Sequence, residues 1–280
     1  FWNTMETLIS LMINVFLYTF RRSLVGLTAV SVGLFLISVL IIYTIEAFGG
    51  IAEFQRLFEL MPDSILALFH AQGGFGTTPT SYIAGDYRHP IYLITGFSFG
   101  IAFASGAISR EIERGTILMY LASPIERWQY VLAKIGVLVI GTAIIAFSIW
   151  LGSFVGAELY GLPKGEIEKM LLVFAQINMW SLMLAFGGIT LLISAYSSDG
   201  GLTIAWAAGI SIVMYFVDFL SLIWSVAEPL GPLSLFHYFD PVGIARDAVF
   251  PWFEFLILMG VSALSMLLAL YVFQKRDISN

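Results

Sequence analysis

The dominant pattern along this chain is a series of long apolar runs separated by more polar segments. A helix needs about 20 predominantly apolar residues to cross the hydrocarbon core of a bilayer. Six runs are long enough, at residues 23–44, 89–107, 129–155, 170–196, 202–224 and 252–273. Each run is expected to be helical, because lipid offers no hydrogen-bond partners to the open edge of a sheet. The pattern therefore predicts an all-α integral membrane protein with six transmembrane helices.

Composition and charge support this prediction and exclude several functions. Charged residues make up only 11% of the 280 residues, against about 25% in soluble globular domains. The net charge of −6 argues against nucleic acid as a partner, because phosphate binding needs clustered Lys and Arg. With no cysteine, the chain has no disulfide, thiolate metal ligand or cysteine nucleophile.

Lys and Arg placement orients the spans, because cytosolic loops carry an excess of these residues. With both termini in the cytosol, the cytosolic segments hold eight basic and six acidic residues, and the external segments hold five basic and twelve acidic. The opposite orientation would reverse the rule. We therefore expect both termini to be cytosolic, with external segments at 46–88 and 225–251 and a cytosolic segment at 109–127.

Two segments outside the apolar runs are amphipathic. Residues 1–22 carry large apolar side chains at helical spacing and end in Arg21 and Arg22. They predict a separate helix lying in the cytosolic membrane interface, or alternatively a plain cytosolic tail, and residues 23–280 form the transmembrane domain. In the external segment, residues 51–60 and 64–71 predict two short helices before a glycine-rich loop.

The polar segment 109–127 joins the second and third spans. It begins with four charges in five residues, Arg110, Glu111, Glu113 and Arg114. Gly115 is expected to end a helix there, and Thr116 to cap a short apolar helix over 117–122. An exposed apolar helix favours contact with a partner protein, or alternatively with the underside of the membrane.

The third span is predicted to begin inside this same segment. Ser123 is placed as the N-cap, Pro124 at the first helical position and Glu126 at the third position of a capping box. A helix from there to residue 155 would be about 48 Å long, whereas the hydrocarbon core is about 30 Å thick. The helix should therefore tilt strongly or project into the cytosol.

Several catalytic and binding motifs fail when tested. No G-x-x-x-x-G-K-[S/T] sequence occurs, so the chain has no P-loop, and no H-E-x-x-H or histidine cluster predicts a metal site. Residues 96–100 match the G-x-S-x-G nucleophile elbow at Ser98, but that motif needs a strand-to-helix turn and lies here within a span. Gly96 and Gly100 are better interpreted as a stripe for close helix contact, as are Gly152 and Gly156.

Three polar side chains lie inside apolar runs. A carboxylate within the membrane is costly, so Asp218 is interpreted either as part of a substrate path or as a group paired with a helix end or with external water. Gln176 and Asn178 are candidates for the same path, or for hydrogen bonds across helices.

The run at 113–127, ERGTILMYLASPIER, has an acid, Gly-Thr, a Leu-rich stretch, Ser-Pro and a basic residue in that order, and Lys134 follows it. This run resembles the cytosolic signature of the type-2 ATP-binding-cassette (ABC) exporter permeases. Residues 233–241, LSLFHYFDP, are similar to the aromatic-Asp-Pro stretch of that family. The six-span layout also agrees. Two features depart from the family pattern: Ala133 stands where Gly is common, and the 46–88 segment is long.

The resemblance implies a transport subunit, not an enzyme, that forms the translocation path of an exporter in the plasma membrane. It implies two copies of a separate ABC ATPase that bind ATP and Mg²⁺, and a second permease in a homodimer or heterodimer, with no cofactor on this chain. The coupling residues would be Arg110, Glu111, Glu113, Arg114, Gly115, Thr116, Leu118, Tyr120, Ser123, Pro124, Glu126 and Arg127. Two alternatives remain open, an intramembrane enzyme and a regulatory or mechanotransmitting membrane protein that uses the same ATPase contact.

Overall fold

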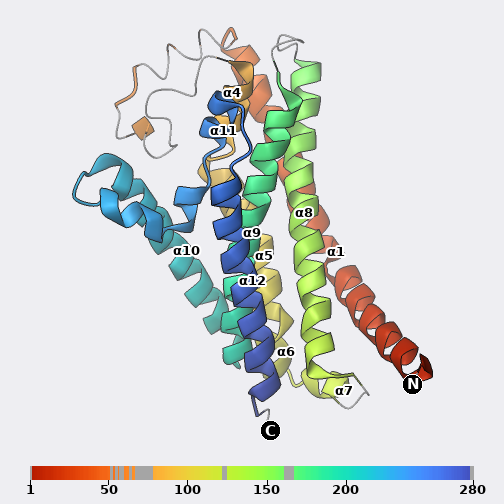
Figure 1. Ribbon diagram of the computed structural model, residues 1–280. Coiled ribbons are helices and arrows are strands. Elements are labelled where there is room, and N and C mark those ends of the chain that lie inside the picture. Colours follow the sequence, from red (N-terminus) through yellow and green to blue (C-terminus); the bar gives the residue numbers. More distant parts are fainter. Residues whose placement is uncertain are drawn as a thin grey trace.

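The structure is a computed structural model that describes residues 2–50, 53, 56, 60–62, 65–66, 78–121, 125–160 and 167–277. Within these residues the chain forms a bundle of helices (Figure 1). Six of the described helices are long and apolar enough to cross a membrane, which confirms the predicted fold class. These are α1 (Trp2–Ala47), α5 (Pro90–Ala107), α8 (Arg127–Leu159), α9 (Lys169–Tyr196), α10 (Gly200–Ile223) and α12 (Trp252–Lys275).

Helix α1 corrects the predicted boundary at residue 22. It runs without a break through Arg21 and Arg22, so the expected interfacial helix and the first span are one element. No Gly or Pro occurs in residues 1–22, and nothing in the sequence stops the helix there. Figure 1 shows the N-terminal part of α1 pointing away from the bundle. Its position in the membrane interface stays a prediction.

Close contact between α1 and α8 depends on the two glycines of the predicted stripe. A Cβ at Gly152 would lie 2.5 Å from the carbonyl oxygen of Phe35, and one at Gly156 would lie 3.2 Å from the Cα of Val39. The absence of a side chain therefore lets the two backbones approach each other. This confirms that the pair serves helix contact.

Helix α9 lies at the centre and is the most buried of the six spans. It contacts α12 through Gly188, where a Cβ would lie 3.1 Å from the carbonyl oxygen of Ser262. It contacts α5 at Gly96, where a Cβ would lie 2.6 Å from the methyl group of Met183. Gly96 is thus a contact position between helices, as the sequence predicts.

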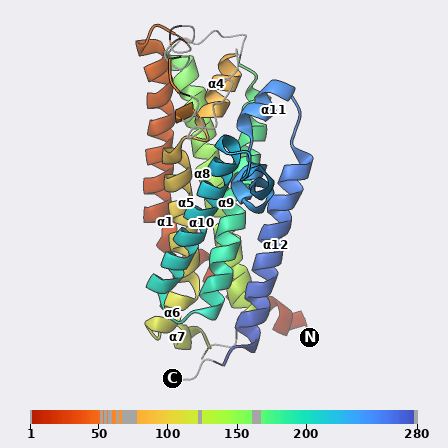
Figure 2. The same ribbon diagram turned by 90° about the vertical axis from the view of Figure 1, so that its left-hand side faces the viewer.

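Helix α10 is the least buried span and leans away from the bundle in Figure 1. It follows α9 after a short turn, so the two are antiparallel neighbours as expected. After α10 the chain folds back through the 3₁₀ helices η1 (Glu228–Leu233) and η2 (Leu235–Tyr238) and then α11 (Pro241–Asp247). Helix α4 (Pro79–Asp86) lies beside α11 at this end of the bundle, which we call the α4 end (Figure 2). The helices predicted at 51–60 and 64–71 lie largely outside the described residues.

The opposite end, called the α6–α7 end, holds α6 (Ser109–Glu113), α7 (Ile117–Leu121) and both ends of the chain (Figures 1 and 2). The predicted start of the third span is wrong by three residues. Helix α8 begins at Arg127, with Glu126 as its N-cap in an extended conformation. The Glu126 amide donates to the side chain of Gln129 at 3.0 Å, which satisfies the helix start. Ser123 and Pro124 lie outside the described residues.

Candidate functional site

The polar segment after α5 folds as two short helices joined by a tight turn. Gly115 has φ +68°, a left-handed conformation that favours glycine, and this ends α6 as predicted. The Thr116 hydroxyl was expected to cap α7, but it donates backwards to the main-chain carbonyl of Glu111 at 3.2 Å. This hydrogen bond holds the turn against α6 and so fixes the orientation of α7 relative to α6.

Glu111 anchors α6 to α8 through a buried ion pair. Its Oε1 accepts from Lys134 Nζ at 2.8 Å, and both side chains are less than a tenth exposed. The Tyr130 hydroxyl donates to the second carboxylate oxygen and lies 2.8 Å from the carbonyl oxygen of Ala107. The Lys134 ammonium also lies 4.9 Å from the centre of the Tyr130 ring. A carboxylate expected to face a partner is therefore an internal tie between α6 and α8.

Glu113 and Arg110 fix α6 to the start of α10. The Glu113 carboxylate accepts from the Gly200 amide at 3.0 Å, next to the Asp199 side chain that caps α10. A Cβ at Gly200 would lie 3.0 Å from the Cβ of Arg110, so the turn between α9 and α10 closes directly on α6. A negative charge is favourable at this N-terminus because of the helix dipole.

A buried cluster of hydroxyls joins three helices behind this surface. The Ser109 amide donates to the Ser194 hydroxyl at 2.9 Å, and Thr203 lies 3.1 Å from the Ser109 hydroxyl. Ser194 belongs to α9 and Thr203 to α10, and all three residues are fully buried. Satisfied hydrogen bonds of this kind hold helices in one register.

The C-terminal end of α12 is tied to the same region. Arg276 donates to the carbonyl oxygens of Ala195 and Ser197 at 2.7 and 2.8 Å, and burial lowers its pKa. Arg127, at the start of α8, donates to the carbonyl of Arg276 and lies over the ring of Phe273. Two arginines thus connect α8, α9 and α12 near the bundle end.

The outer face of α7 is apolar and open. Met119 is 77% exposed and Leu118 40%, whereas Ile117 is buried. Tyr120 is partly buried, and burial together with the charge of Glu111 raises its pKa to about 12. Arg114, Gly115 and Glu126 are also exposed. The arrangement is an apolar face rimmed by charges on a rigid base, which is typical of a protein contact surface.

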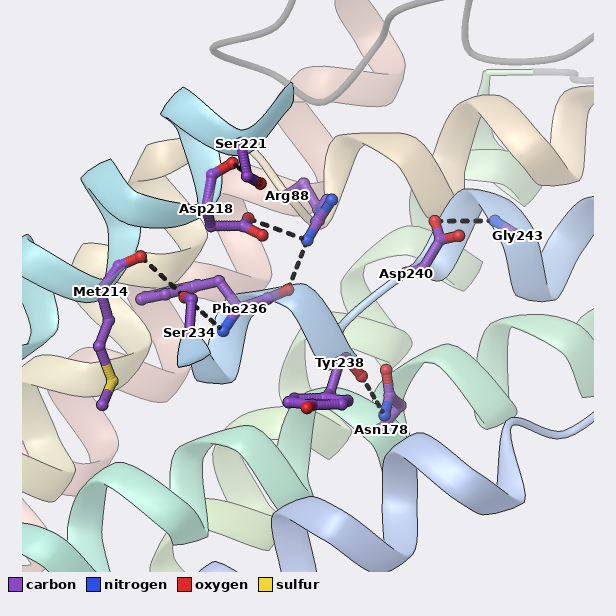
Figure 3. A network of polar contacts seen from close by, with 10 residues as sticks. All are labelled: Arg88, Asn178, Met214, Asp218, Ser221, Ser234, Phe236, Tyr238, Asp240 and Gly243. Carbon is purple, nitrogen blue, oxygen red and sulfur yellow. Dashed lines mark hydrogen bonds and ion pairs between the residues drawn. The ribbon is translucent and has the colours of Figure 1, made fainter. Parts of the chain in front are cut away.

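At the α4 end, Asp218 forms a second buried ion pair, shown in Figure 3. Arg88 Nη2 lies 3.5 Å from its Oδ2 and donates to the carbonyl of Phe236 at 2.6 Å. Burial lowers the pKa of Arg88, and the charge of Asp218 opposes that shift. Ser234 completes the link by donating to the carbonyl of Met214 at 2.7 Å. Asp218 is therefore paired with an arginine that holds the η1–η2 segment against α10.

The other two intramembrane polar residues differ in their partners. The Asn178 amide donates to the carbonyl of Tyr238 at 3.2 Å (Figure 3), a bond across elements of the kind predicted. Both side-chain atoms of Gln176 are buried, and neither forms a hydrogen bond of standard geometry with a described residue. Gln176 faces Tyr87, whose pKa is raised by burial. That Asp218, Gln176 and Asn178 line a substrate path stays a prediction.

Neither a metal-binding cluster nor a nucleophile elbow at Ser98 occurs among the described residues. They contain no group of three His, Asp or Glu residues that could hold a metal ion. The Ser98 hydroxyl donates to the carbonyl of Thr95 at 2.6 Å within α5, and the strand-to-helix turn of a nucleophile elbow is absent there.

The structure thus brings most of the predicted coupling residues together at the α6–α7 end, but it gives them two different tasks. Glu111 and Glu113 bind other helices, whereas Arg114 and Leu118 face outward, together with Met119, which the sequence interpretation did not include. The sequence interpretation missed the partners Tyr130, Arg276 and Arg88. The role of Arg88 could have been predicted from the sequence. A carboxylate within a span, such as Asp218, needs a positive partner, and Arg88 directly precedes the predicted span at 89–107.

Six apolar helices tied by buried polar contacts at both ends define a multi-pass membrane protein. A family model described as ABC-2 family transporter protein matches residues 17–278. The chain belongs to this family and is accordingly a permease of an ABC transporter, a membrane subunit for transport. No curated protein and no solved structure matches it.

Proposed function

We propose that this permease is the membrane subunit of an ATP-driven exporter, and that a separate ABC ATPase docks on its α6–α7 end. The observation that carries this proposal is the exposed apolar face of Leu118 and Met119 on a rigid base. The charges of Arg114 and Glu126 around that face would set the orientation of the partner.

Motion of the ATPase bound at α7 would be transmitted to the spans through the side-chain contacts of α6. Glu111 connects α6 to α8, a 33-residue helix about 50 Å long. Glu113 connects α6 to α10, and α6 directly follows α5. Closure of the ATPases around ATP and Mg²⁺ would therefore shift α5, α8 and α10 together as rigid levers.

The complex we propose contains two ATPase subunits and two permeases, identical or different, in the plasma membrane. The α6–α7 end would face the cytosol, where its excess of Arg and Lys satisfies the positive-inside rule. The exposed apolar side chains of α10, among them Trp206, Val213 and Phe216, suit contact with lipid or with the second permease.

Co-purification of the ATPase tests this proposal. Tagged wild-type chain is expected to retain an ABC ATPase, and Met119→Glu should reduce the retained amount at least ten-fold by placing a charge in the apolar contact. Val249→Glu is the matched control, because Val249 is 62% exposed and lies between α11 and α12 at the opposite end. Equal retention by wild type and Met119→Glu, or loss only in the control, would refute the docking site.

A further inference from the structure

An open groove lies between α1 and the α5–α6 segment, next to the proposed ATPase surface on α7. It has a volume of about 520 Å³, within the range of small-molecule sites. Its walls come mainly from α1, α5 and α6, and Lys134 of α8 also lines it. No segment within the described residues fills it.

The groove has a basic end and an apolar end. Arg22, Arg110 and Arg114 line the end nearer α6 and α7, and none of them has a carboxylate within ion-pair distance among the described residues. Lys134 is neutralised by Glu111, so the three arginines leave an excess of positive charge. Arginine binds phosphate oxygens in a bidentate manner, which makes this end suited to an anion.

The opposite end of the groove is lined by apolar side chains and by glycines that keep it open. Phe99 and Phe103 form one wall, with stacked rings 5.9 Å apart. No atom lies within 4 Å of a Cβ built on Gly26 or Gly106. From Thr19 to Val30 along α1 the groove extends about 16 Å, close to half of the hydrocarbon thickness of a bilayer.

We propose that this groove binds one anionic glycerophospholipid from the leaflet at the α6–α7 end. The phosphate lies at Arg22 and Arg110, and one acyl chain follows Gly26 and Phe103. A glycerophospholipid has a charged phosphate at one end and alkyl chains at the other, which matches the basic and apolar ends of the groove. Arg114 borders both this groove and the proposed ATPase surface, whereas Arg22 and Gly106 belong to the groove alone, and lipid retention and ATPase retention are separate measurements.

The test is native mass spectrometry of the full chain after equilibration with equal amounts of phosphatidylglycerol and phosphatidylcholine. Wild type is expected to retain one phosphatidylglycerol with at least a five-fold preference. Arg22→Gln should lower this preference about five-fold, the effect of one arginine near the membrane surface. Excess glycerol phosphate should not displace the lipid, because the acyl chain contributes most of the contact.

Two glycine variants separate filling of the groove from general damage. Gly106→Leu places a side chain in the groove and should abolish retention of both lipids. Gly260→Leu on α12, also without atoms within 4 Å of its Cβ, should bind as wild type does. If Gly106→Leu fails to fold, Arg22→Gln still decides the question. Equal retention of the two lipids by wild type, an unchanged preference in Arg22→Gln, or displacement by glycerol phosphate would overturn the proposal.

Discussion

The Nζ of Lys134 lies 2.8 Å from Oε1 of Glu111, and this buried pair joins the charged segment after α5 to the first turns of α8. One partner lies in the segment that the sequence marks as a contact surface, and the other lies inside a span. The pair therefore makes the contact surface and the membrane helix a single mechanical unit.

Removing one member of this pair should destabilise the fold. Glu111→Gln leaves the Lys134 ammonium buried without its counter-charge, which is expected to cost about 3–5 kcal/mol. Glu113→Gln, on the same helix but exposed, should cost about 1 kcal/mol for one weakened hydrogen bond. Unfolding curves in detergent compare the two. Combining Glu111→Gln with Lys134→Met should recover part of the loss, and a double variant as unstable as the sum of the two single ones would contradict the pairing.

The contact of α1 with α8 should be sensitive to a single methyl group. Gly152→Ala places a Cβ 2.5 Å from the carbonyl oxygen of Phe35, so the helices must separate, at a cost of about 1–3 kcal/mol. Gly209→Ala, where no atom lies within 4 Å, is expected to be neutral or to stabilise α10 by up to about 1 kcal/mol. Thermal unfolding measures both, and the same melting temperature for the two variants would show that α1 and α8 are not in close contact.

The stability of the α4 end should respond to pH through Asp86. Burial raises its pKa from 3.8 to about 7, with an opposing effect of a hydrogen bond to Tyr92. Between these pH values the folded chain holds a proton that the unfolded chain has lost, so stability falls as pH rises through this window. Asp86 keeps some solvent exposure, and water reduces the size of the effect.

Asp86→Asn cannot ionise, and it should be more stable than wild type above pH 7 and flatten the pH dependence between 4 and 7. Unfolding curves recorded across this range provide the measurement. Glu228→Gln, an exposed acid in η1, serves as the control and should leave the wild-type pH dependence in place. Parallel curves for wild type and Asp86→Asn would show that Asp86 is not protonated in the fold.

Arg88 should hold the η1–η2 segment against α10. Arg88→Met removes the donor to the Phe236 carbonyl and leaves Asp218 buried without this cation, so amide hydrogen exchange in η1 and η2 should speed up at least ten-fold. The double variant Arg88→Met with Asp218→Leu should slow exchange again, because it removes the second charge as well. Unchanged exchange in Arg88→Met would mean that other contacts hold this segment.

The sequence predicts the spans well because the bilayer demands long apolar helices. Five of the six spans lie within four residues of the predicted runs, and the glycine stripes lie where helices touch. The continuity of α1 through residue 22 was not predicted, because Arg21 and Arg22 were interpreted as the end of an interfacial helix, whereas two arginines do not interrupt a helix. The start of α8 was misplaced because Ser-Pro is a strong helix-start signal that competes with the weaker signal of Glu126 and Gln129.

The sequence identifies the segment that forms the candidate site, but not which of its side chains face inward and which face outward. The charges of 109–116 identify the segment, but a sequence does not show that Glu111 turns inward toward Lys134 while Met119 turns outward. The same holds for Asp218, whose partner Arg88 lies 130 positions away in the chain. Pairing across such a separation is decided by how the helices assemble, which local patterns do not contain.

Cysteine cross-linking at α7 tests the central claim most directly, because the chain contains no cysteine of its own. Met119→Cys is treated in native membranes with a cysteine-reactive photo-cross-linker, and Val249→Cys at the opposite end is the control. The account predicts that Met119→Cys alone forms a cross-linked product, and that mass spectrometry identifies the attached protein as an ABC ATPase. Cross-linking of the ATPase to Val249→Cys, or of only lipid to Met119→Cys, would contradict it.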